Sequence, residues 1–269
     1  MGFAMTGPVL LSTHDLGVRF GAFQAVAGVN LSLAAGDRHA LIGPNGAGKT
    51  TLINLLTGVL KPSEGRVQLD AQDVTAWSPD ARVRRGLART FQINALFPRL
   101  TPLQSVLLAL AERERIGAVW WKPMGRYRPL HDEAERLLAL LRLGDLAHVP
   151  VAELAYGKQR LLEIALAMAT RPRVLLLDEP AAGVPKDESG EIFDAVAALP
   201  TDVAVLFIEH DMQLVFRFAR RISVLVAGRQ LTEGSPAEIA ADPRVREVYL
   251  GRAHARLPVA PHAPEAVHG

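Results

Sequence analysis

The stretch GPNGAGKT, at positions 43–50, combines three glycines with a lysine and a threonine. Glycines let backbone N–H groups curve around an anion without Cβ clashes, and a helix that starts there adds positive potential. Lys49 is placed to reach the β- and γ-phosphates of a nucleotide, and the Thr50 hydroxyl to bind Mg²⁺. The pattern is typical of a P-loop, with predicted nucleotide-binding residues Gly43, Pro44, Asn45, Gly46, Ala47, Gly48, Lys49, Thr50 and Thr51.

A second candidate site is the acidic pair Asp178-Glu179, which follows the apolar run RVLLL. In open parallel sheets, ligands bind outside the carboxyl ends of the strands. Asp178 suits Mg²⁺, directly or through water, and Glu179 suits polarising an attacking water. Adjacent acids at a strand end can also be merely solvated, but beside a P-loop the catalytic interpretation is favoured.

Two kinds of strand are expected to position these residues. The runs HALIG, RVLLLDE, VAVLFIE and ISVLVAG are short and nearly continuously apolar, which indicates strands covered by helices on both faces and hence an α/β core. Near the N-terminus, LGVRF and VNLSL alternate apolar and polar residues, which is typical of half-buried antiparallel strands. GRVQLDAQDV, at 65–74, is predicted to add one more strand.

Helical patterns dominate between Phe91 and Pro172, notably DEAERLLALLRLGDL at 132–146, and predict a helical subdomain inserted into the core. The sequence SPAE at 235–238 is a capping box that opens a late helix. Residues 252–269 have no apolar period and are predicted to be disordered. Their three histidines lack the spacing and partners of a metal site.

Composition limits the classes of function. The chain has 269 residues, of which 49% are hydrophobic and 22% charged, so we expect one core that carries a large insertion. A formal net charge of +2 does not indicate a nucleic-acid-binding protein. The absence of cysteine and of a secretory signal predicts an intracellular chain. The apolar runs are far shorter than the roughly 20 residues that span a bilayer.

Five motifs in order resemble those of the ATP-binding subunits of ABC transporters, over about 8–251: GPNGAGKT as Walker A, TFQ as the Q-loop, LAYGKQ as the signature, LLLDEP as Walker B and EHD with the switch histidine. The resemblance implies an α/β P-loop NTPase (RecA-like) core with an N-terminal antiparallel β subdomain and an inserted α-helical subdomain at about 92–171. The cassette domain is then 1–251 and the tail 252–269.

The resemblance also implies roles for single residues. Gln92 would contact Mg²⁺ or the attacking water, His210 the γ-phosphate, and Phe20 the adenine ring. The catalytic set is then Glu179, His210 and Gln92, and the metal set Thr50, Gln92 and Asp178. In a head-to-tail dimer the signature closes over ATP bound to the other subunit, through Leu154, Ala155, Tyr156, Gly157, Lys158 and Gln159.

Two departures from the family pattern bear on this dimer. The usual signature serine is Ala155, which removes one hydroxyl donor. After DEPAAG, the residues Val184-Pro185-Lys186-Asp187 stand where Leu, then Asn or Asp, then Pro are common, so the D-loop group that contacts the partner is displaced. The signature stretch also predicts an ordinary amphipathic helix that packs Leu161, Ile164 and Leu166 inward.

Within the family, RTFQINALFPRLTPLQSV and the ending VYLG look most like importers of branched-chain amino acids and related amides. The implied cofactors are ATP and Mg²⁺. The implied partners are a second ATP-binding subunit, either a non-identical paralogue or another copy of this chain, two transmembrane permease subunits and, indirectly, a solute-binding protein, with no nucleic acid. The implied location is the cytoplasmic face of the inner membrane, peripheral through the permeases.

Two other classes of P-loop protein agree less well with these motifs. A soluble ABC ATPase acting on ribosomes or DNA usually carries tandem cassettes or long coiled-coil insertions, which this sequence lacks. A regulatory P-loop GTPase or kinase would leave the signature and EHD unexplained, and no Asn-Lys-x-Asp guanine-binding motif occurs. Cargo is not encoded in this chain, because transported molecules contact the permease and the binding protein.

Overall fold

Short apolar strands form a central sheet of six strands, and the computed structural model describes the chain over residues 7–90, 96–115 and 128–250. The strand order is β11-β10-β4-β9-β8-β7, parallel except for the β10–β11 pair. The four predicted buried strands are confirmed. The six strands are β4 (Arg38–Ile42), β7 (Leu87–Arg89), β8 (Val174–Asp178), β9 (Ala204–Ile208), β10 (Arg221–Val226) and β11 (Arg229–Gly234).

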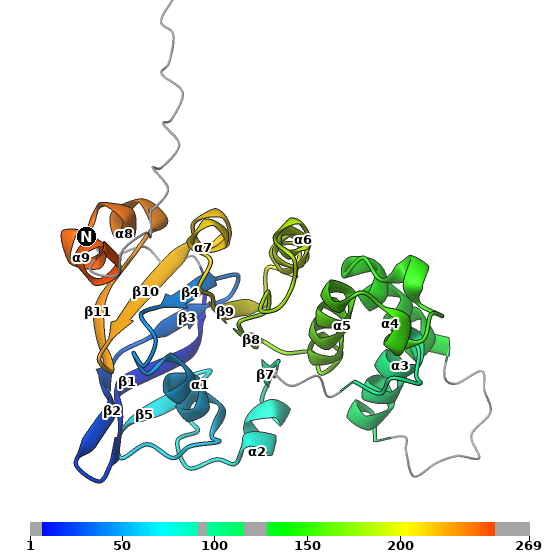
Figure 1. The fold of residues 1–269 in the computed structure, drawn as a ribbon. Helices are drawn as coiled ribbons and strands as arrows, with labels where there is room; N and C mark the ends of the chain where they lie inside the picture. The colour runs from blue at the N-terminus through cyan, green and yellow to red at the C-terminus, as the bar shows by residue number, and fades with distance from the viewer. Residues whose placement is uncertain (1–6, 91–95, 116–127, 251–269) are drawn as a thin grey trace, which may run out of the picture.

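A second sheet, from the N-terminal part of the chain, is antiparallel as predicted. Its order is β2-β1-β5-β6, and β3 also pairs with β1. Figure 1 shows this sheet and helix α1 on one side of the molecule. The strands are β1 (Val9–Phe20), β2 (Phe23–Val29), β3 (Ser32–Ala34), β5 (Glu64–Leu69) and β6 (Gln72–Asp73).

Two of the expected strands are interrupted. The run VNLSL breaks between β2 and β3 because the buried Thr13 hydroxyl takes over local backbone bonds: it donates to the carbonyl of Val29 and accepts from the N–H of Leu31. The predicted single strand at 65–74 is a hairpin of β5 and β6. Asp70 and Ala71 both have positive φ, as a two-residue hairpin turn of the primed type requires.

Helices inserted between β7 and β8 form a separate group beside the sheets (Figure 1). The predicted helix at 132–146 ends early, at Leu140, because Arg142 adopts a left-handed conformation, and only a short 3₁₀ turn follows at Gly144–Leu146. The described helices of this inserted subdomain are α3 (Pro102–Arg113), α4 (Arg128–Leu140) and α5 (Tyr156–Ala169).

The remaining helices flank the sheets. The predicted capping box is present at Ser235, whose hydroxyl accepts the N–H of Glu238 while the Glu238 carboxylate accepts the N–H of Ser235. These helices are α1 (Lys49–Thr57), α2 (Pro79–Arg84), α6 (Lys186–Ala197), α7 (Met212–Phe218), α8 (Pro236–Ala241) and α9 (Pro243–Leu250). In the described parts of the chain, no helix is both long and apolar enough to cross a membrane.

Apolar side chains on the two faces of the central sheet enter different cores. On β4, Ala40 and Ile42 pack with the helical insertion and α6, whereas Leu41 packs with α1 and the antiparallel sheet. On β8, Leu175 and Leu177 alternate with Leu176 in the same way. Burial on both faces explains the continuous apolar runs. The expected fold class is confirmed, while the domain limits at 92–171 and 251 stay predictions and the tail lies outside the described residues.

Candidate nucleotide site

The P-loop lies between the carboxyl end of β4 and the first turn of α1. Two of its glycines are required by close approaches: a Cβ on Gly43 would meet the carbonyl oxygen of Leu225, and one on Gly48 would lie 2.7 Å from that of Ala25. Gly48 has φ of 99° and is the N-cap of α1, and as a glycine it makes no side-chain bond to the helix end. The first N–H groups of α1 can therefore bond an anion.

Lys49 folds back over this loop. Its Nζ donates to the carbonyl oxygens of Gly43 at 2.8 Å and Pro44 at 3.2 Å, and the residue is only 7% exposed. Burial lowers the pKa of Lys49, and the negative charges of Glu179 and Asp178 oppose that shift. A phosphate would offer the ammonium a charged partner in place of two neutral carbonyls.

The other P-loop residues differ in exposure. Thr50 is exposed, so its hydroxyl is open to a metal or phosphate ligand at the start of α1. Asn45 and Gly46 are also exposed, Gly43 and Ala47 are buried, and Pro44, Gly48 and Thr51 are intermediate.

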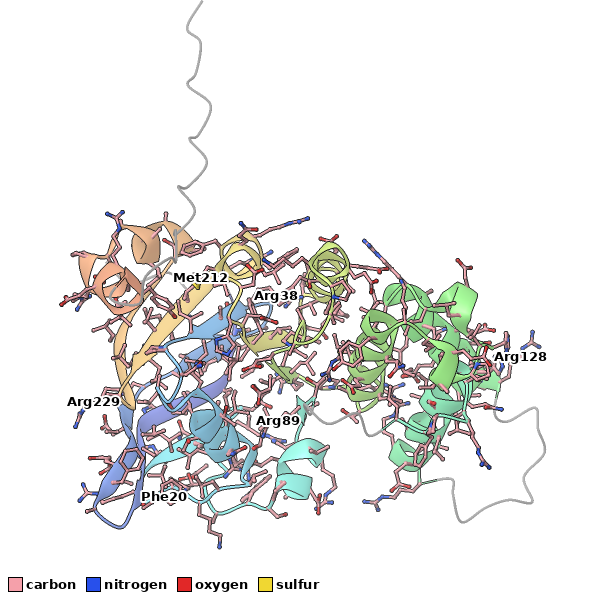
Figure 2. All side chains as sticks on the ribbon, viewed as in Figure 1. Phe20, Arg38, Arg89, Arg128, Met212 and Arg229 are labelled. Atoms are coloured by element: carbon pink, nitrogen blue, oxygen red, sulfur yellow. The ribbon has the colours of Figure 1, made fainter. Side chains whose placement is uncertain are left out.

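Asp178 is the last residue of β8, and its carboxyl side chain is 1% exposed. Arg89, at the end of the neighbouring strand β7, donates from Nη2 to Asp178 Oδ2 at 2.8 Å and from Nη1 to Asn54 Oδ1 at 2.7 Å. Figure 2 shows Arg89 between α1 and the inserted helices. One guanidinium therefore ties the acidic strand end to the P-loop helix.

Glu179 has a positive φ of 51°, and its N–H donates to the carbonyl oxygen of Ile208 at 3.1 Å. Its Oε1 lies 2.8 Å from Nε2 of His210, and the two side chains are 25% and 47% exposed. The structure thus brings the expected base and the expected switch histidine together, at the ends of the adjacent strands β8 and β9.

A buried acid supports both turns. Glu209 is 6% exposed and accepts the backbone N–H of Ala181 at 3.0 Å and of His210 at 3.1 Å. Burial raises the pKa of Glu209, although these N–H bonds oppose that shift. Through these bonds Glu209 links the turn after β8 to the turn after β9.

Phe20 ends strand β1 and is 52% exposed, near the free end of the β1–β2 hairpin (Figure 2). Its cross-strand neighbour Phe23 is 67% exposed. Exposed aromatic rings are uncommon without a ligand or partner, because burying a ring of this size is strongly favourable. The hairpin thus offers two candidate platforms for a base, and only Phe20 was predicted from the sequence.

The signature stretch forms the N-terminal end of α5. Ala155 is the N-cap and makes no side-chain cap bond. Lys158 pairs with Glu191 of α6 at 2.6 Å, and Gln159 Nε2 donates to the carbonyl oxygen of Leu154 at 3.0 Å. On the inward face, Leu161 and Ile164 are buried as predicted, and Leu166 is partly buried.

Two further predictions from the sequence concern the D-loop residues and Gln92. Pro185 is the N-cap of α6, so Asp187 falls in the first helical turn instead of in the preceding loop. Gln92 lies outside the described residues, so its expected contacts with Mg²⁺ or water stay predictions.

Comparison with known proteins identifies the chain. Residues 26–182 match the ABC transporter family, and residues 229–255 match the C-terminal domain of branched-chain amino acid ATP-binding cassette transporters. The chain belongs to the ABC transporter family. This ABC cassette is 38% identical to the high-affinity branched-chain amino acid transport ATP-binding protein BraF of Pseudomonas aeruginosa, over 93% of this chain and 100% of that protein.

Solved structures resemble this ABC cassette closely. One, an ATP-binding cassette of an ABC transporter in its ADP conformation, has 32% identity and a TM-score of 0.78, and covers 90% of this chain and 99% of that one. A dimeric cassette in a post-hydrolysis state, bound to ADP and Pi, has 25% identity and a TM-score of 0.68, with 84% and 99% covered. The chain is therefore a nucleotide-binding ATPase of the ABC transporter type.

Sequence reasoning missed three residues of this ABC cassette's site: Arg89, Asn54 and Glu209. Arg89 immediately precedes TFQ, but its partner Asp178 is 89 positions away, and no spacing rule connects the two. Glu209 lies inside the IEHD stretch, where only the histidine was singled out.

Proposed function

We propose that this chain is the ATP-hydrolysing subunit of an importer for branched-chain amino acids or related amino acids and amides. The observation that carries the cargo class is the match of residues 229–255 to the branched-chain amino acid ATP-binding cassette transporter family, together with the similarity to BraF along the whole of that relative. The cassette itself does not contact the cargo, so the assignment rests on similarity to its relatives.

The P-loop would hold the nucleotide phosphates. Lys49 already has its ammonium inside the loop, and α1 begins without a side-chain cap. A γ-phosphate would take up the free helix-end N–H groups and draw Nζ from the carbonyls of Gly43 and Pro44. Phe20 would stack on the adenine ring.

The donor set fits Mg²⁺. Thr50 offers an exposed hydroxyl and Asp178 a carboxylate, and hard oxygen donors are the ligands that Mg²⁺ prefers. Each carboxylate oxygen has two lone pairs, so Asp178 Oδ2 keeps one beside its bond from Arg89. Thr50, Asp178 and Gln92 would hold the ion, which would neutralise charge on the transferred phosphoryl group.

Glu179 would orient and polarise the attacking water, because a carboxylate at a strand end next to the phosphates can accept its proton. His210 would contact the γ-phosphate. The 2.8 Å contact between His210 Nε2 and Glu179 Oε1 supports their acting as one unit. Nucleotide binding would place the histidine between the carboxylate and the phosphate.

The partner would be a second ATP-binding subunit, either a paralogue or another copy of this chain. The similar dimeric cassette bound to ADP and Pi supports such a pair. In this dimer the N-terminal end of α5, with Leu154–Gln159, would close over the nucleotide of the other subunit. The bare N-cap at Ala155 leaves helix-end N–H groups for that phosphate.

The permease subunits would contact the inserted helical subdomain. Phe97 and Leu108 are 60% and 53% exposed, and both line an apolar surface cavity of about 400 Å³ with Pro98, Arg99 and Leu100. An exposed apolar patch of this kind marks a protein contact. Through it the ATPase would sit at the cytoplasmic face of the inner membrane, with a solute-binding protein reached only through the permeases.

The deciding experiment is uptake of radiolabelled leucine by cells that lack this gene, complemented with the wild-type gene or with Leu108→Asp. We expect the wild type to restore uptake. Leu108→Asp should keep ATP binding in the isolated subunit but lose both co-purification with the permeases and uptake. Normal leucine, isoleucine and valine uptake in the deletion strain would exclude the proposed cargo. A cassette that never co-purifies with membrane proteins would favour the soluble ABC ATPase instead.

A further inference from the structure

A small polar cavity lies behind the acidic strand end, on the side of the inserted helices. It measures about 10 Å³ and is lined by Thr90, Arg160, Glu163, Ile164, Asp178 and Pro180. Three buried side-chain atoms of these residues have no hydrogen-bond partner in the part of the chain that the structure describes: Asp178 Oδ1, Arg160 Nε and Glu163 Oε1. Their side chains are 1%, 7% and 11% exposed. Leaving such atoms unpaired in a protein interior costs about 1–3 kcal/mol each.

Neighbouring contacts hold these atoms in place. Arg160 donates from Nη1 to Glu163 Oε2 at 2.8 Å and from Nη2 to the Tyr156 hydroxyl at 2.6 Å, and its guanidinium lies 5.0 Å from the centre of the Tyr156 ring. Asp178 Oδ2 is held by Arg89. The planar guanidinium and the carboxylate cannot turn to pair their remaining atoms elsewhere without breaking these bonds.

We propose that one water molecule binds in this cavity and joins the three atoms. It would accept the N–H of Arg160 Nε and donate one proton each to Asp178 Oδ1 and Glu163 Oε1, so that all three orphan atoms are bonded. The cavity is just large enough for one water, which typically makes about three hydrogen bonds to buried polar groups. A metal ion is disfavoured by the adjacent guanidinium, and the described residues hold no cluster of metal-binding side chains.

The water site connects the two functional ends of one chain. Asp178 serves the chain's own nucleotide, whereas Arg160 anchors Tyr156, the first residue of α5, at the end that faces the partner's nucleotide. Tyr156 also packs on the turn after Glu179, since a Cβ on Gly183 would lie 3.1 Å from its ring. Arg160 and Glu163 are therefore positioning residues: through the water they fix the plane of the Asp178 carboxylate and the start of α5 together.

This inference rests on the proposed role of Asp178 toward Mg²⁺. The first measurement is independent of that role: a crystal structure at high resolution should show one ordered water within hydrogen-bonding distance of the three atoms. A dry cavity, or Arg160 Nε bonded to another protein group, would overturn the proposal.

The second measurement is the gain in ATP affinity on adding Mg²⁺, by calorimetry with and without a chelator. Arg160→Met removes the donor to the water, and supporting residues behind a metal ligand are typically worth 10–100-fold in metal affinity, so we expect the apparent Mg²⁺ affinity to fall about tenfold. Glu163→Gln should retain the site, because its amide can donate to the same water, which then donates only to Asp178. Glu135→Gln, on the exposed side of α4, is the matched control.

The outcomes separate the two hypotheses. If Asp178→Asn leaves the gain in ATP affinity on adding Mg²⁺ (the Mg²⁺ effect) unchanged, the proposed role of Asp178 fails. If Asp178→Asn abolishes the effect but Arg160→Met leaves it intact, the water link fails and the proposed function stands. If Arg160→Met lowers the ATP affinity equally with and without Mg²⁺, the substitution has caused a general structural defect. That result would also overturn the proposed water link between Arg160 and Asp178. Should Arg160→Met not fold, the crystallographic test still decides.

Discussion

Nε2 of His210 lies 2.8 Å from Oε1 of Glu179, although the two residues follow different strands. The contact is held from behind, since the backbone N–H of His210 bonds the buried carboxylate of Glu209. In this arrangement the histidine orients the carboxylate that would act on water. Turnover should therefore depend on the ability of the Glu179 side chain to accept a proton more than on its size and shape.

Glu179→Gln should stop turnover while leaving ATP binding nearly unchanged, because the amide keeps the hydrogen bond to His210 but cannot accept a proton. We expect ATPase activity to fall by about 100-fold or more, as is typical for loss of a general base. Phosphate release and nucleotide affinity would be measured side by side, with exposed Glu247→Gln as the control. Turnover within about twofold of wild type would exclude this base.

Lys49→Ala should weaken nucleotide binding itself. The lost interaction is a charged hydrogen bond to phosphate worth roughly 1.5–3 kcal/mol, or about 10–100-fold in affinity. Calorimetry with ATP is the measurement, and the exposed Lys61, just beyond α1, gives the control Lys61→Ala. An unchanged affinity in Lys49→Ala would contradict the P-loop assignment.

Phe20→Ala should reduce affinity for ATP, whereas Phe23→Ala should not. Stacking of a base on an aromatic ring is worth roughly 1–3 kcal/mol, so a loss of about 5- to 100-fold is expected at the stacking residue. Binding of inorganic tripolyphosphate, which has no base, should be unaffected by either change. If Phe23→Ala alone weakens ATP binding, then the adenine platform is the neighbouring residue.

Ala155→Ser should have two separable effects. The backbone at Ala155, with φ of −55° and ψ of 149°, is close to that of the serine caps at Ser78 and Ser235, so the new hydroxyl should cap α5 and stabilise the monomer by about 1 kcal/mol. It should also tighten the ATP-bound dimer, because the hydroxyl adds a donor to the partner's phosphate. Melting temperature and dimer formation would be followed together.

The trans effect of Ala155→Ser is isolated in a forced dimer with a Lys49→Ala chain. Only one arrangement then places the serine opposite an intact P-loop, and only that arrangement should change turnover. ATP affinity of the monomer should stay the same. A changed monomer affinity with unaltered dimerisation would show that the signature acts within its own subunit.

His39 should make the fold sensitive to acid. It is fully buried beside Ser223, Glu233 and Arg221, and burial lowers the pKa of His39 from 6.5 to about 4. Between these two values the unfolded chain binds more protons than the folded one, so the free energy of unfolding falls as the pH drops from 6.5 to 4. The loss is on the order of 3 kcal/mol.

Denaturant unfolding at several pH values tests the role of His39. His39→Met should reduce the fall in the free energy of unfolding between pH 6.5 and 4. His148→Gln, at an exposed position, should leave that fall unchanged. A wild-type curve that is flat over this range would mean that His39 is not the titrating group.

The sequence predicted those features of the protein that depend on residues close together in the chain. The P-loop glycines, the strand before them and the capping box at Ser235 are each set by residues within a few positions, and all were located from the sequence. Glu179 and His210 were placed at strand ends that proved to be neighbours because parallel strands bring their carboxyl ends to one edge.

Features that depend on distant contacts were missed. The Arg89–Asp178 pair and the support from Glu209 require the strand order, which no spacing in the sequence reveals. The break in VNLSL is caused by Thr13, a side chain from another strand. The hairpin at Asp70-Ala71 lacks the Asn-Gly or Asp-Gly that usually marks such a turn, so a single continuous strand was predicted there.

Helices α2, α3, α7 and α8 each begin with a side chain that bonds the helix end, whereas the N-cap residues of α1, α5 and α6 (Gly48, Ala155 and Pro185) make no such bond. A missing cap costs a helix about 1 kcal/mol, a sizeable fraction of the stability of an ordinary domain. Under the proposed arrangement one triphosphate completes α1 of one chain and α5 of the other. We then expect the empty, separated subunit to be the form most exposed to cellular proteases. Nucleotide supply would in that case influence how long the protein survives as well as how fast it works.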